Sequence, residues 1–306
     1  MRRNSDETTR GVQESAHFVR SWIASADISS NSPVSFPDFS ASDAQIQWQR
    51  FCDLLWYHDD LGLWLDVSRM HLNASELEAL QPAMDRAFTA MHELEAGAIA
   101  NPDEERQVGH YWLRNPQLAP SDDLRTHIAS EVDDIEAFGR GVVHGEIKAP
   151  SGVPFTDVLW IGIGGSGLGP ALMIRALQNN NQGLPFHFLD NVDPNGMSNV
   201  LGGLAGRFKT TLVVTVSKSG GTPEPHIGME QARLKLEAAG GEWAGQAVAI
   251  TMLNSRLDQQ AQQEAWLKRF DMFDWVGGRP SITSAVGLPP GAPTGCAIRQ
   301  FFAGAA

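Results

Sequence analysis

Cysteine is scarce in this sequence, and neither a long hydrophobic run nor an excess of basic residues is present. The 306 residues include two cysteines, Cys52 and Cys296, which lie far apart and form no metal-ligand pattern, so we interpret them as reduced thiols. No uncharged apolar stretch reaches the roughly eighteen residues that a transmembrane helix needs. The sequence therefore argues against cysteine-built metal sites and against a membrane-spanning segment.

Acidic residues outnumber basic ones, 36 against 23, and the formal net charge is -13. This charge argues against nucleic acids and anionic membranes as partners. An anionic ligand would gain nothing from the overall field, so local donors would have to bind it. The length and the 42% hydrophobic content suffice for a buried core, and we expect a soluble, cytoplasmic protein.

The first 45 residues differ from the rest of the chain. They are rich in serine, contain Pro33 and Pro37, and lack apolar periodicity. We predict that residues 1–45 are a disordered extension, or that they follow from an upstream start codon chosen in error. A transit peptide is the alternative, but acidic residues among the arginines oppose it, and there is no apolar core of a secretion signal.

Apolar residues at spacings of three and four predict helices within residues 46–150. One begins near Ala44, a second carries a stripe from Leu77 to Leu94 and begins or kinks at Pro82, and a third follows Ser121. We interpret all three stripes as core-facing.

Beyond residue 150, continuous apolar runs alternate with helical segments. The runs predict five strands, near Val158–Ile163, Phe186–Leu189, Leu212–Val216, Ala247–Met252 and Met272–Trp275. Such a pattern predicts an α/β fold with a doubly wound parallel sheet covered by helices on both faces. Ligands of these sheets bind at the carboxyl ends of the strands, where the glycine-containing motifs fall.

The first of these motifs reads DVLWIGIGGSGLGP, from Asp157 to Pro170. It predicts a strand, a glycine turn and a helix N-terminus, where unpaired N–H groups and the helix dipole favour an anion. Two alternatives remain open. The glycines could serve only an ordinary tight turn. They also match the dinucleotide fingerprint G-x-G-x-x-G, with Asp190 where a ribose-binding acid would stand.

The second motif, SKSGGTPE, follows the strand that ends at Val216. Its hydroxyls, its ammonium group and its glycines can surround a phosphate with short donors, and a dinucleotide site needs no such second cradle. Thr222 also suits the N-cap of the next helix, with Pro223 at the first helical position. Both roles can hold together.

Five motifs in one order resemble the glucose-6-phosphate isomerase family, in the branch found in bacteria and plastids, and the resemblance extends from about Gln47 to the last residue. They are GHYWLR (Gly109–Arg114), IGIGGSGLGP (Ile161–Pro170), LDNVDP (Leu189–Pro194), SKSGGTPE (Ser217–Glu224) and DWVGGRPS (Asp274–Ser281). The resemblance implies a reversible aldose–ketose isomerisation of glucose 6-phosphate and fructose 6-phosphate in glycolysis and gluconeogenesis. It also implies a sugar phosphate as the small-molecule partner, no cofactor and no metal, and a homodimer for full-length members.

The resemblance further implies the roles of individual residues. The phosphate would be held by Ser217, Lys218 (mainly through its backbone N–H), Ser219 and Thr222, with Gly165 and Ser166 against the sugar. Arg279 would be the catalytic arginine that stabilises the enediolate. An isolated arginine would more simply form a surface ion pair, but the GGR context favours the catalytic role.

The resemblance implies that residues 151–290 are a sugar-isomerase domain, the first of two, and that residues 291–306 are a truncated start of the second. The family places its catalytic glutamate, a histidine and a late lysine after GGR, and this chain reaches only residue 306, 27 beyond Arg279. Pro280 also replaces the aromatic residue that the family has there. We therefore expect this chain to be incomplete and inactive by itself. A non-catalytic sugar-phosphate-binding domain is the alternative, and a nicotinamide-dependent oxidoreductase is a more distant one.

Overall fold

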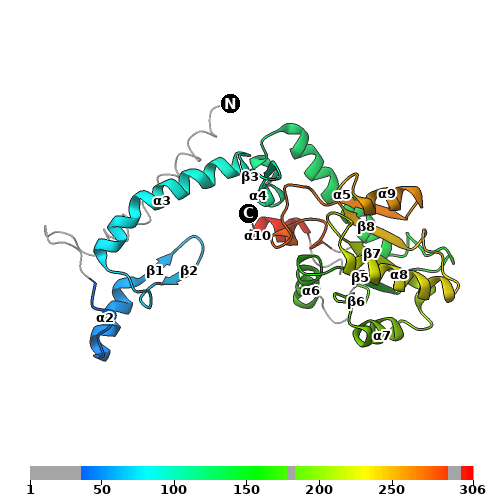
Figure 1. Cartoon of the computed structure of the whole chain (residues 1–306), viewed down its shortest axis with the longest axis horizontal. Coiled ribbons are helices and arrows are strands. Elements are labelled where there is room, and N and C mark those ends of the chain that lie inside the picture. The colour runs from blue at the N-terminus through cyan, green and yellow to red at the C-terminus, as the bar shows by residue number, and fades with distance from the viewer. Residues whose placement is uncertain (1–35, 178–182, 289–297, 306) are drawn as a thin grey trace. The chain divides into compact units, whose positions relative to one another are not determined.

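The computed structural model describes residues 36–177, 183–288 and 298–305. The chain divides into two compact units, an N-terminal unit of residues 1–93 and a sheet unit of residues 94–306 (Figure 1). Most of the predicted disordered segment, and Cys296, lie outside the described residues, whereas Cys52 is exposed. Residues 94–150 belong to the same compact unit as the sheet, and the domain limits taken from the sequence stay predictions.

The first helix in the described part of the N-terminal unit is α2 (Ala44–Leu54), close to the predicted start. The Asp43 carboxylate caps this helix by accepting hydrogen bonds from the first free N–H groups, at 2.8 and 3.2 Å. An antiparallel hairpin follows, formed by β1 (Leu55–His58) and β2 (Leu63–Asp66). The interpretation of residues 46–150 as helical did not include this hairpin.

Helix α3 spans Ala74–Glu95 and continues through Pro82, so the prediction that it could begin at the proline was wrong. The start is set earlier by Asn73, whose side chain accepts the Glu76 N–H at 2.9 Å while the Glu76 carboxylate accepts the Asn73 N–H at 2.8 Å. Two orphan N–H groups are satisfied by this reciprocal pair. The capping pair was the sequence signal that we missed.

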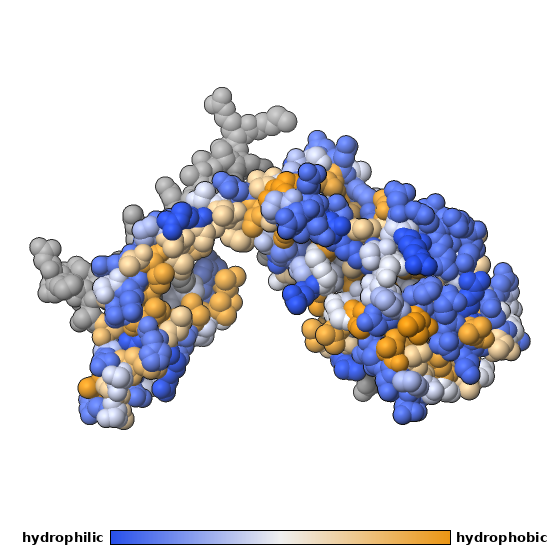
Figure 2. All heavy atoms as spheres, in the orientation of Figure 1, coloured by the Kyte–Doolittle hydropathy of each residue, from blue (hydrophilic) through white to orange (hydrophobic). Residues whose placement is uncertain are grey.

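The N-terminal unit buries few side chains. Helix α3 contains no buried residue, so the interpretation of its apolar stripe as core is wrong for this structure. The exposed large apolar residues of the unit include Trp48, Leu61, Trp64, Leu80, Met84 and Met91. Figure 2 shows apolar side chains along α3 and at the β1–β2 hairpin on the visible face. An apolar stripe becomes core only where another element covers it, and the α3 stripe stays open within this unit.

The sheet unit is built on five parallel strands in the order β6-β5-β7-β8-β9, which confirms the predicted fold class. The strands are β5 (Asp157–Ile161), β6 (Phe186–Leu189), β7 (Thr211–Val216), β8 (Ala247–Thr251) and β9 (Lys268–Asp271). The three central strands are buried along their whole length, as expected for strands covered on both faces.

Helices cover both faces of this sheet. Their bounds are α4 (His110–Arg114), α5 (Asp122–Val143), α6 (Gly165–Leu177), α7 (Pro194–Gly203), α8 (Pro223–Ala238), α9 (Arg256–Gln263) and α10 (Ile298–Ala305). Short elements complete the unit: β3 (Ile99–Asn101), β4 (Arg106–Gln107), and the 3-10 turns η1 (Pro116–Leu118), η2 (Phe208–Thr210) and η3 (Ser281–Thr283).

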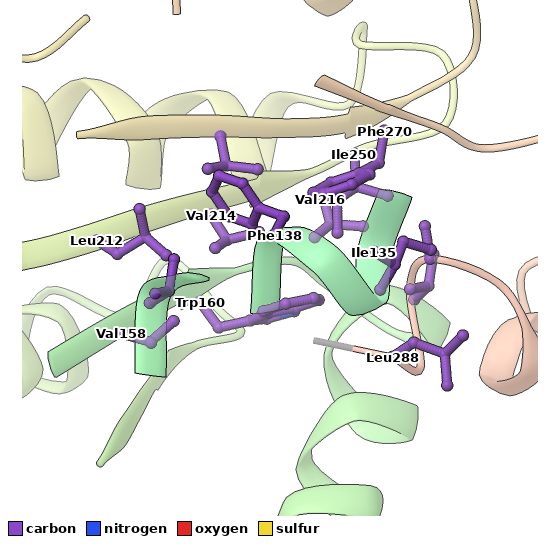
Figure 3. Packing of buried hydrophobic residues seen from close by; sticks show 14 of the residues in the cluster. Ile135, Phe138, Val158, Trp160, Leu212, Val214, Val216, Ile250, Phe270 and Leu288 are labelled. Carbon is purple, nitrogen blue, oxygen red and sulfur yellow. The ribbon is translucent and has the colours of Figure 1, made fainter. Parts of the chain in front are cut away.

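Alternate residues of each strand build two separate cores, because successive side chains point to opposite faces. On one face Trp160 packs with Ile135 and Phe138 of α5 (Figure 3). On the other face Leu159 packs in a cluster with Met229 of α8. Both faces of the sheet are therefore sealed, and its strand ends are left to carry the loops.

The fifth strand was predicted at Met272–Trp275, and this prediction was wrong. Strand β9 runs from Lys268 to Asp271 and pairs with β8 alone. An edge strand exposes part of its surface, so polar residues suit it and its sequence lacks an apolar run. The apolar segment after β9 instead packs outside the sheet, where Phe273 and Trp275 lie in one cluster with Trp112.

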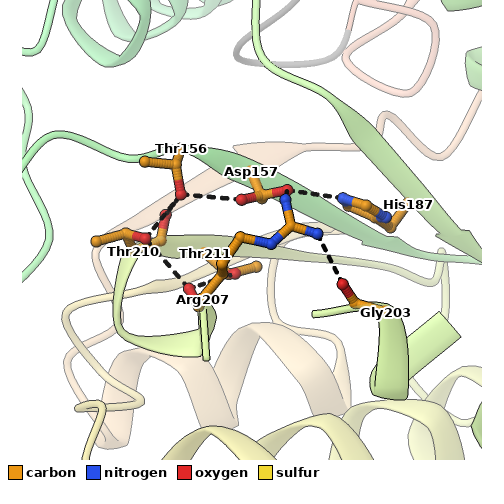
Figure 4. A network of polar contacts seen from close by, with 7 residues as sticks. All are labelled: Thr156, Asp157, His187, Gly203, Arg207, Thr210 and Thr211. Carbon is orange, nitrogen blue, oxygen red and sulfur yellow. Dashed lines mark hydrogen bonds and ion pairs between the residues drawn. The ribbon is translucent and has the colours of Figure 1, made fainter. Parts of the chain in front are cut away.

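The amino edge of the sheet is held by a buried carboxylate. Asp157 is fully buried and accepts hydrogen bonds from Thr156 at 2.9 Å, His187 at 2.8 Å and Arg207 at 2.5 Å (Figure 4). These partners replace the water that the charge loses on burial. The network lies at the strand beginnings, so it supports the sheet from the end opposite to the glycine loops.

Along the part of the chain that the structure describes, no helix combines the length and the apolar character needed to cross a bilayer.

Candidate functional site

The loops after β5 and β7 flank the position where the strand order changes direction. From β5 the chain crosses to β6 on one side and then returns to β7 on the other. In open α/β sheets, ligands bind in the crevice that this reversal leaves at the carboxyl ends of the strands. Two of the predicted motifs therefore lie on either side of the expected binding position.

The loop after β7, residues 217–222, forms an open cradle of N–H groups. Four backbone N–H groups have no hydrogen-bond partner among the described residues, namely those of Lys218, Ser219, Gly220 and Thr222. Successive free N–H groups in a turn make a concavity that suits an anion. This is the local chemistry that a phosphate needs.

Thr222 occupies the N-cap position of α8, with Pro223 at the first helical position, as predicted. Its hydroxyl does not cap the helix and instead lies 3.5 Å from the Ser217 hydroxyl. The capping alternative therefore holds for the backbone but not for the side chain. The hydroxyl and the positive end of the α8 dipole are left facing the cradle.

Residues of β8 and α9 support the cradle, and the sequence did not predict these contacts. Thr251, the last residue of β8, donates its hydroxyl to the Ser217 carbonyl at 2.7 Å. Gly220 has a φ of 67° and lies against α9, where an added Cβ would stand 2.3 Å from the Leu257 nitrogen. Only glycine fits this left-handed position.

The loop after β5 is partly closed by its own hydrogen bonds. The N–H groups of Ser166 and Gly167 donate to carbonyls of their own turn at 3.1 Å, and that of Leu168 at 2.8 Å. The buried Trp160 donates its indole N–H to the Ser166 carbonyl at 2.7 Å. The N–H groups of Ile163, Gly164 and Gly165 have no partner among the described residues, so this geometry leaves both the tight-turn and the anion-binding alternatives open for the first motif.

The third motif reaches the first across the sheet edge. An added Cβ at Gly165 would stand 2.1 Å from the Gly278 carbonyl oxygen, so the start of α6 and the GGR segment are in backbone contact. Strand β9, from which this segment departs, is not a neighbour of β5 in the sheet. The sequence placed both motifs at the carboxyl edge but could not show that they touch.

Arg279 is exposed and has no hydrogen-bond or ion-pair partner among the described residues, so the surface ion-pair alternative finds no support. Pro280 follows with φ −85° and begins the η3 turn. The Ser281 hydroxyl donates to the Gly278 carbonyl at 2.6 Å. An unpaired guanidinium on a held backbone is available to an anionic group.

Two carboxyl groups meet at the end of β9. The Glu131 carboxylate accepts the Asp271 N–H at 2.7 Å, and the Asp271 carboxylate lies 3.6 Å from the His127 ring nitrogen. Burial, aided by the charges of Asp271 and Asp134, raises the pKa of Glu131 to about 7. Burial also raises the pKa of Asp271. Within the described residues, no group of three or more acidic, histidine or cysteine side chains is placed to hold a metal ion.

The dinucleotide alternative also has a structural counterpart. Asp190 directly follows β6 and is exposed, and its Cβ would lie 3.4 Å from a Cβ added at Gly167. The acid thus stands near the start of α6, as a ribose-binding acid would. Local geometry alone leaves this alternative open, and the relatives of the chain decide between the two.

A family model described as phosphoglucose isomerase matches residues 66–306. A glucose-6-phosphate isomerase of Synechococcus sp. (strain CC9902) is 96% identical over 273 residues, which cover 89% of this chain and 51% of that protein. The enzyme of the same name from Parasynechococcus marenigrum (strain WH8102) is 72% identical over 287 residues, covering 94% and 52%. The chain spans about half the length of the curated relatives it matches.

Solved structures give the same answer. The crystal structure of a glucose-6-phosphate isomerase from Chlamydia trachomatis matches with a TM-score of 0.69 and 27% identity, over 97% of this chain and 54% of that one. The sequence and fold comparisons thus point to relatives that carry the same enzyme name.

Proposed function

Because the chain belongs to the phosphoglucose isomerase family, we propose that its cradle and its GGR segment hold the two ends of a sugar phosphate during aldose–ketose isomerisation. The substrates are glucose 6-phosphate and fructose 6-phosphate, as the names of the relatives indicate. The observation that carries the proposal is the set of four unpartnered N–H groups at Lys218, Ser219, Gly220 and Thr222, together with an Arg279 side chain that has no partner among the described residues.

The phosphate is assigned to Ser217, Ser219 and Thr222 and to the backbone N–H of Lys218. Hydroxyl and backbone donors at a helix start bind a phosphate without a net positive field, which this acidic chain lacks. Gly165 and Ser166 are assigned to the sugar, as the family resemblance implies, because the loop after β7 offers more hydroxyl donors for the phosphate.

Arg279 is assigned to the enediolate. Moving a proton between C2 and C1 places negative charge on the sugar oxygens, and a fixed cation lowers the barrier by stabilising that charge. The guanidinium keeps its proton at any working pH, so it supplies charge without acting as an acid. Proton transfer itself requires a base, which we assign to the part of the relatives' length that this chain does not span.

A non-catalytic sugar-phosphate-binding role is the second candidate. It is favoured by the share of the relatives that this chain covers, about half, which includes the assigned binding loops. Both candidates predict sugar-phosphate binding and differ only in turnover. Homodimer formation and a cytoplasmic location are further expectations of the family resemblance.

A coupled assay from fructose 6-phosphate to glucose 6-phosphate tests the catalytic proposal. It compares the 306-residue chain with a length-completed protein, in which the remaining part of the 96% identical relative follows this sequence. We expect turnover only in the length-completed protein, because a placed base contributes about 10²- to 10⁴-fold. Arg279→Ala should then lower turnover about a hundredfold or more with a smaller effect on KM.

Host isomerase must be removed, so the proteins are purified from a strain that lacks its own enzyme. Arg279→Lys is the matched variant, and it should recover little turnover because it lacks the planar fork. Near-normal turnover of Arg279→Ala would remove this residue from the chemistry. Turnover of the 306-residue chain would show that the base lies within it.

A further inference from the structure

The segment that carries Arg279, residues 274–281, is here termed the arginine loop. Of the backbone carbonyls of residues 274–279, three accept hydrogen bonds from residues outside the loop, and a fourth accepts one from within it. Those of Asp274 and Val276 accept from the Lys218 ammonium at 2.7 and 2.8 Å. That of Trp275 accepts from the Gly109 N–H at 3.0 Å, and that of Gly278 from the Ser281 hydroxyl. Hydrogen bonds to its backbone carbonyls therefore hold the arginine loop in place.

Lys218 supplies two of these four hydrogen bonds, and it does so from the phosphate cradle. Its side chain is partly buried, and this burial, followed by the charge of Arg106, lowers the pKa of its ammonium. No carboxylate pairs with the ammonium among the described residues. Charge-assisted hydrogen bonds to carbonyls are stronger than neutral ones, so this contact dominates the attachment of the arginine loop to the cradle.

The two ends of Lys218 thus serve different loops. Its backbone N–H is one of the unpartnered groups of the cradle, whereas its ammonium is engaged with the arginine loop about sixty residues later. A lysine is long enough to span the two, and no other side chain of the cradle contacts the arginine loop by a hydrogen bond. Lys218 therefore belongs both to the proposed phosphate cradle and to the contacts of the arginine loop.

We infer that Lys218 is a positioning residue whose ammonium fixes the arginine loop relative to the phosphate cradle. This inference rests on the proposed function and deepens it. A substrate held at its phosphate then meets Arg279 at a set distance, without reordering of the loop. Misplacement of a charge stabiliser by about 1 Å can cost about a hundredfold in rate, so the positioning contributes to turnover more than to affinity.

The competing role for the ammonium is direct binding of the phosphate. The two roles predict different losses when the charge is removed. A phosphate ligand contributes to the binding of fructose 6-phosphate and leaves the arginine loop unchanged. A positioning residue leaves binding largely unchanged and loosens the loop. The free energies of binding and of loop opening are therefore measured on the same variants.

The first experiment uses the 306-residue chain. Lys218→Met keeps the aliphatic stem and removes the donors. Lys235→Met is the matched control, because Lys235 is exposed on α8 and its ammonium has no hydrogen-bond or ion-pair partner within the described residues. We expect Lys218→Met to raise hydrogen exchange of the 274–281 amides about tenfold, as the loss of a charged hydrogen bond predicts. Its affinity for fructose 6-phosphate should change less than about threefold, because the N–H donors remain.

The second experiment measures kcat and KM in the length-completed protein. Lys218→Met should lower kcat about a hundredfold and leave KM close to its original value. Lys218→Arg keeps donors for both carbonyls and should recover part of kcat. Circular dichroism and urea unfolding establish that each variant folds, and if Lys218→Met does not fold, Lys218→Gln provides the same comparison.

A loss of fructose 6-phosphate affinity with unchanged exchange of the arginine loop would overturn the inference and make the ammonium a phosphate ligand. Unchanged exchange and unchanged kcat would overturn it as well. If the unsubstituted chain does not bind fructose 6-phosphate, the proposed function fails. The attachment of the loop by Lys218 is then still judged by hydrogen exchange, so the two failures are distinguishable.

Discussion

The two compact units use apolar residues in different ways. In the sheet unit, the stripe of α5 is buried, with exposures of 1% for Ile128, 3% for Ile135 and 6% for Phe138. In the N-terminal unit, the similar stripe of α3 is open, and Leu80 is 44% exposed. The same spacing therefore gives a core in one place and a surface in the other. The difference arises from the partners of α5, since the sheet covers Ile135 and Phe138 and the cluster of Trp112 and Phe273 covers Ile128.

The comparison also explains where the candidate site lies. The cradle, the turn after β5 and the arginine loop are all attached to buried strands or to one another. A site that must hold donors within a fraction of an ångström needs such support. In the described part of the N-terminal unit, buried residues are few, and they include Arg50, which is engaged with backbone carbonyls. This unit has no comparable foundation for a site.

The strongest test of the comparison is the removal of the Trp160 side chain. Trp160 is fully buried and packs against α5. Trp160→Ala should lower the free energy of unfolding by about 3 to 5 kcal/mol, as large-to-small changes in a core do. It also removes the hydrogen bond to the Ser166 carbonyl, so fructose 6-phosphate binding should weaken. Urea unfolding and calorimetry measure the two effects. A loss below about 1 kcal/mol would contradict the assignment of Trp160 to a tightly packed core.

A second test concerns the pH dependence of the sheet unit. The pKa of Glu131 rises from 4.5 to about 7 on folding, mainly through burial. A raised carboxyl pKa stabilises the fold fully below the unfolded pKa, and this contribution is lost as the pH rises through 7. Glu131→Gln keeps an acceptor for the Asp271 N–H and removes the charge. At pH 8 it should be more stable than the original chain, by about 3 kcal/mol at most.

The gain from Glu131→Gln should shrink on acidification and be small at pH 4.5, where the carboxyl is largely protonated in the folded state. Urea unfolding at several pH values measures the trend. Glu78→Gln, at an exposed position of α3, is the matched control in the other unit. A variant that loses stability at pH 8 would show that the Glu131 charge is favourable where it stands.

The smallest effect is expected in the N-terminal unit. Leu80→Ala removes an exposed side chain from a helix in which alanine is also favourable, so the free energy of unfolding should change by less than about 0.5 kcal/mol. Hydrogen exchange of α3 peptides measures the local effect. A loss of about 2 kcal/mol or more would show that the stripe is covered in solution, and it would break the comparison.

Local patterns in the sequence predicted most of the sheet unit. Strands β5, β6, β7 and β8 are continuous apolar runs, and the glycines and hydroxyls of the loops stand directly after them. Strand β9 was misplaced because an edge strand carries polar residues. The start of α3 was misplaced because its capping pair was overlooked. Both errors have local causes, and the Asn73–Glu76 signal was present in the sequence.

The relations between the loops could not be predicted in the same way. The contact of Gly165 with Gly278 and that of Lys218 with Asp274 join residues that are far apart in the chain. No spacing rule connects such residues, because the path of the arginine loop depends on how the apolar segment after β9 packs. The motifs supplied the residues of the candidate site, whose roles stay predictions, and only the fold shows which of these segments contact one another.

The most direct test of the account is calorimetry of the 306-residue chain with fructose 6-phosphate and with unphosphorylated fructose. Replacing Ser217 and Thr222 by alanine should weaken binding of the phosphorylated sugar by about 1 kcal/mol or more for each lost donor. Binding of fructose should barely change. Equal losses for both sugars would contradict the assignment of the cradle to phosphate, and saturable binding of NADH in place of the sugar phosphate would favour the dinucleotide alternative.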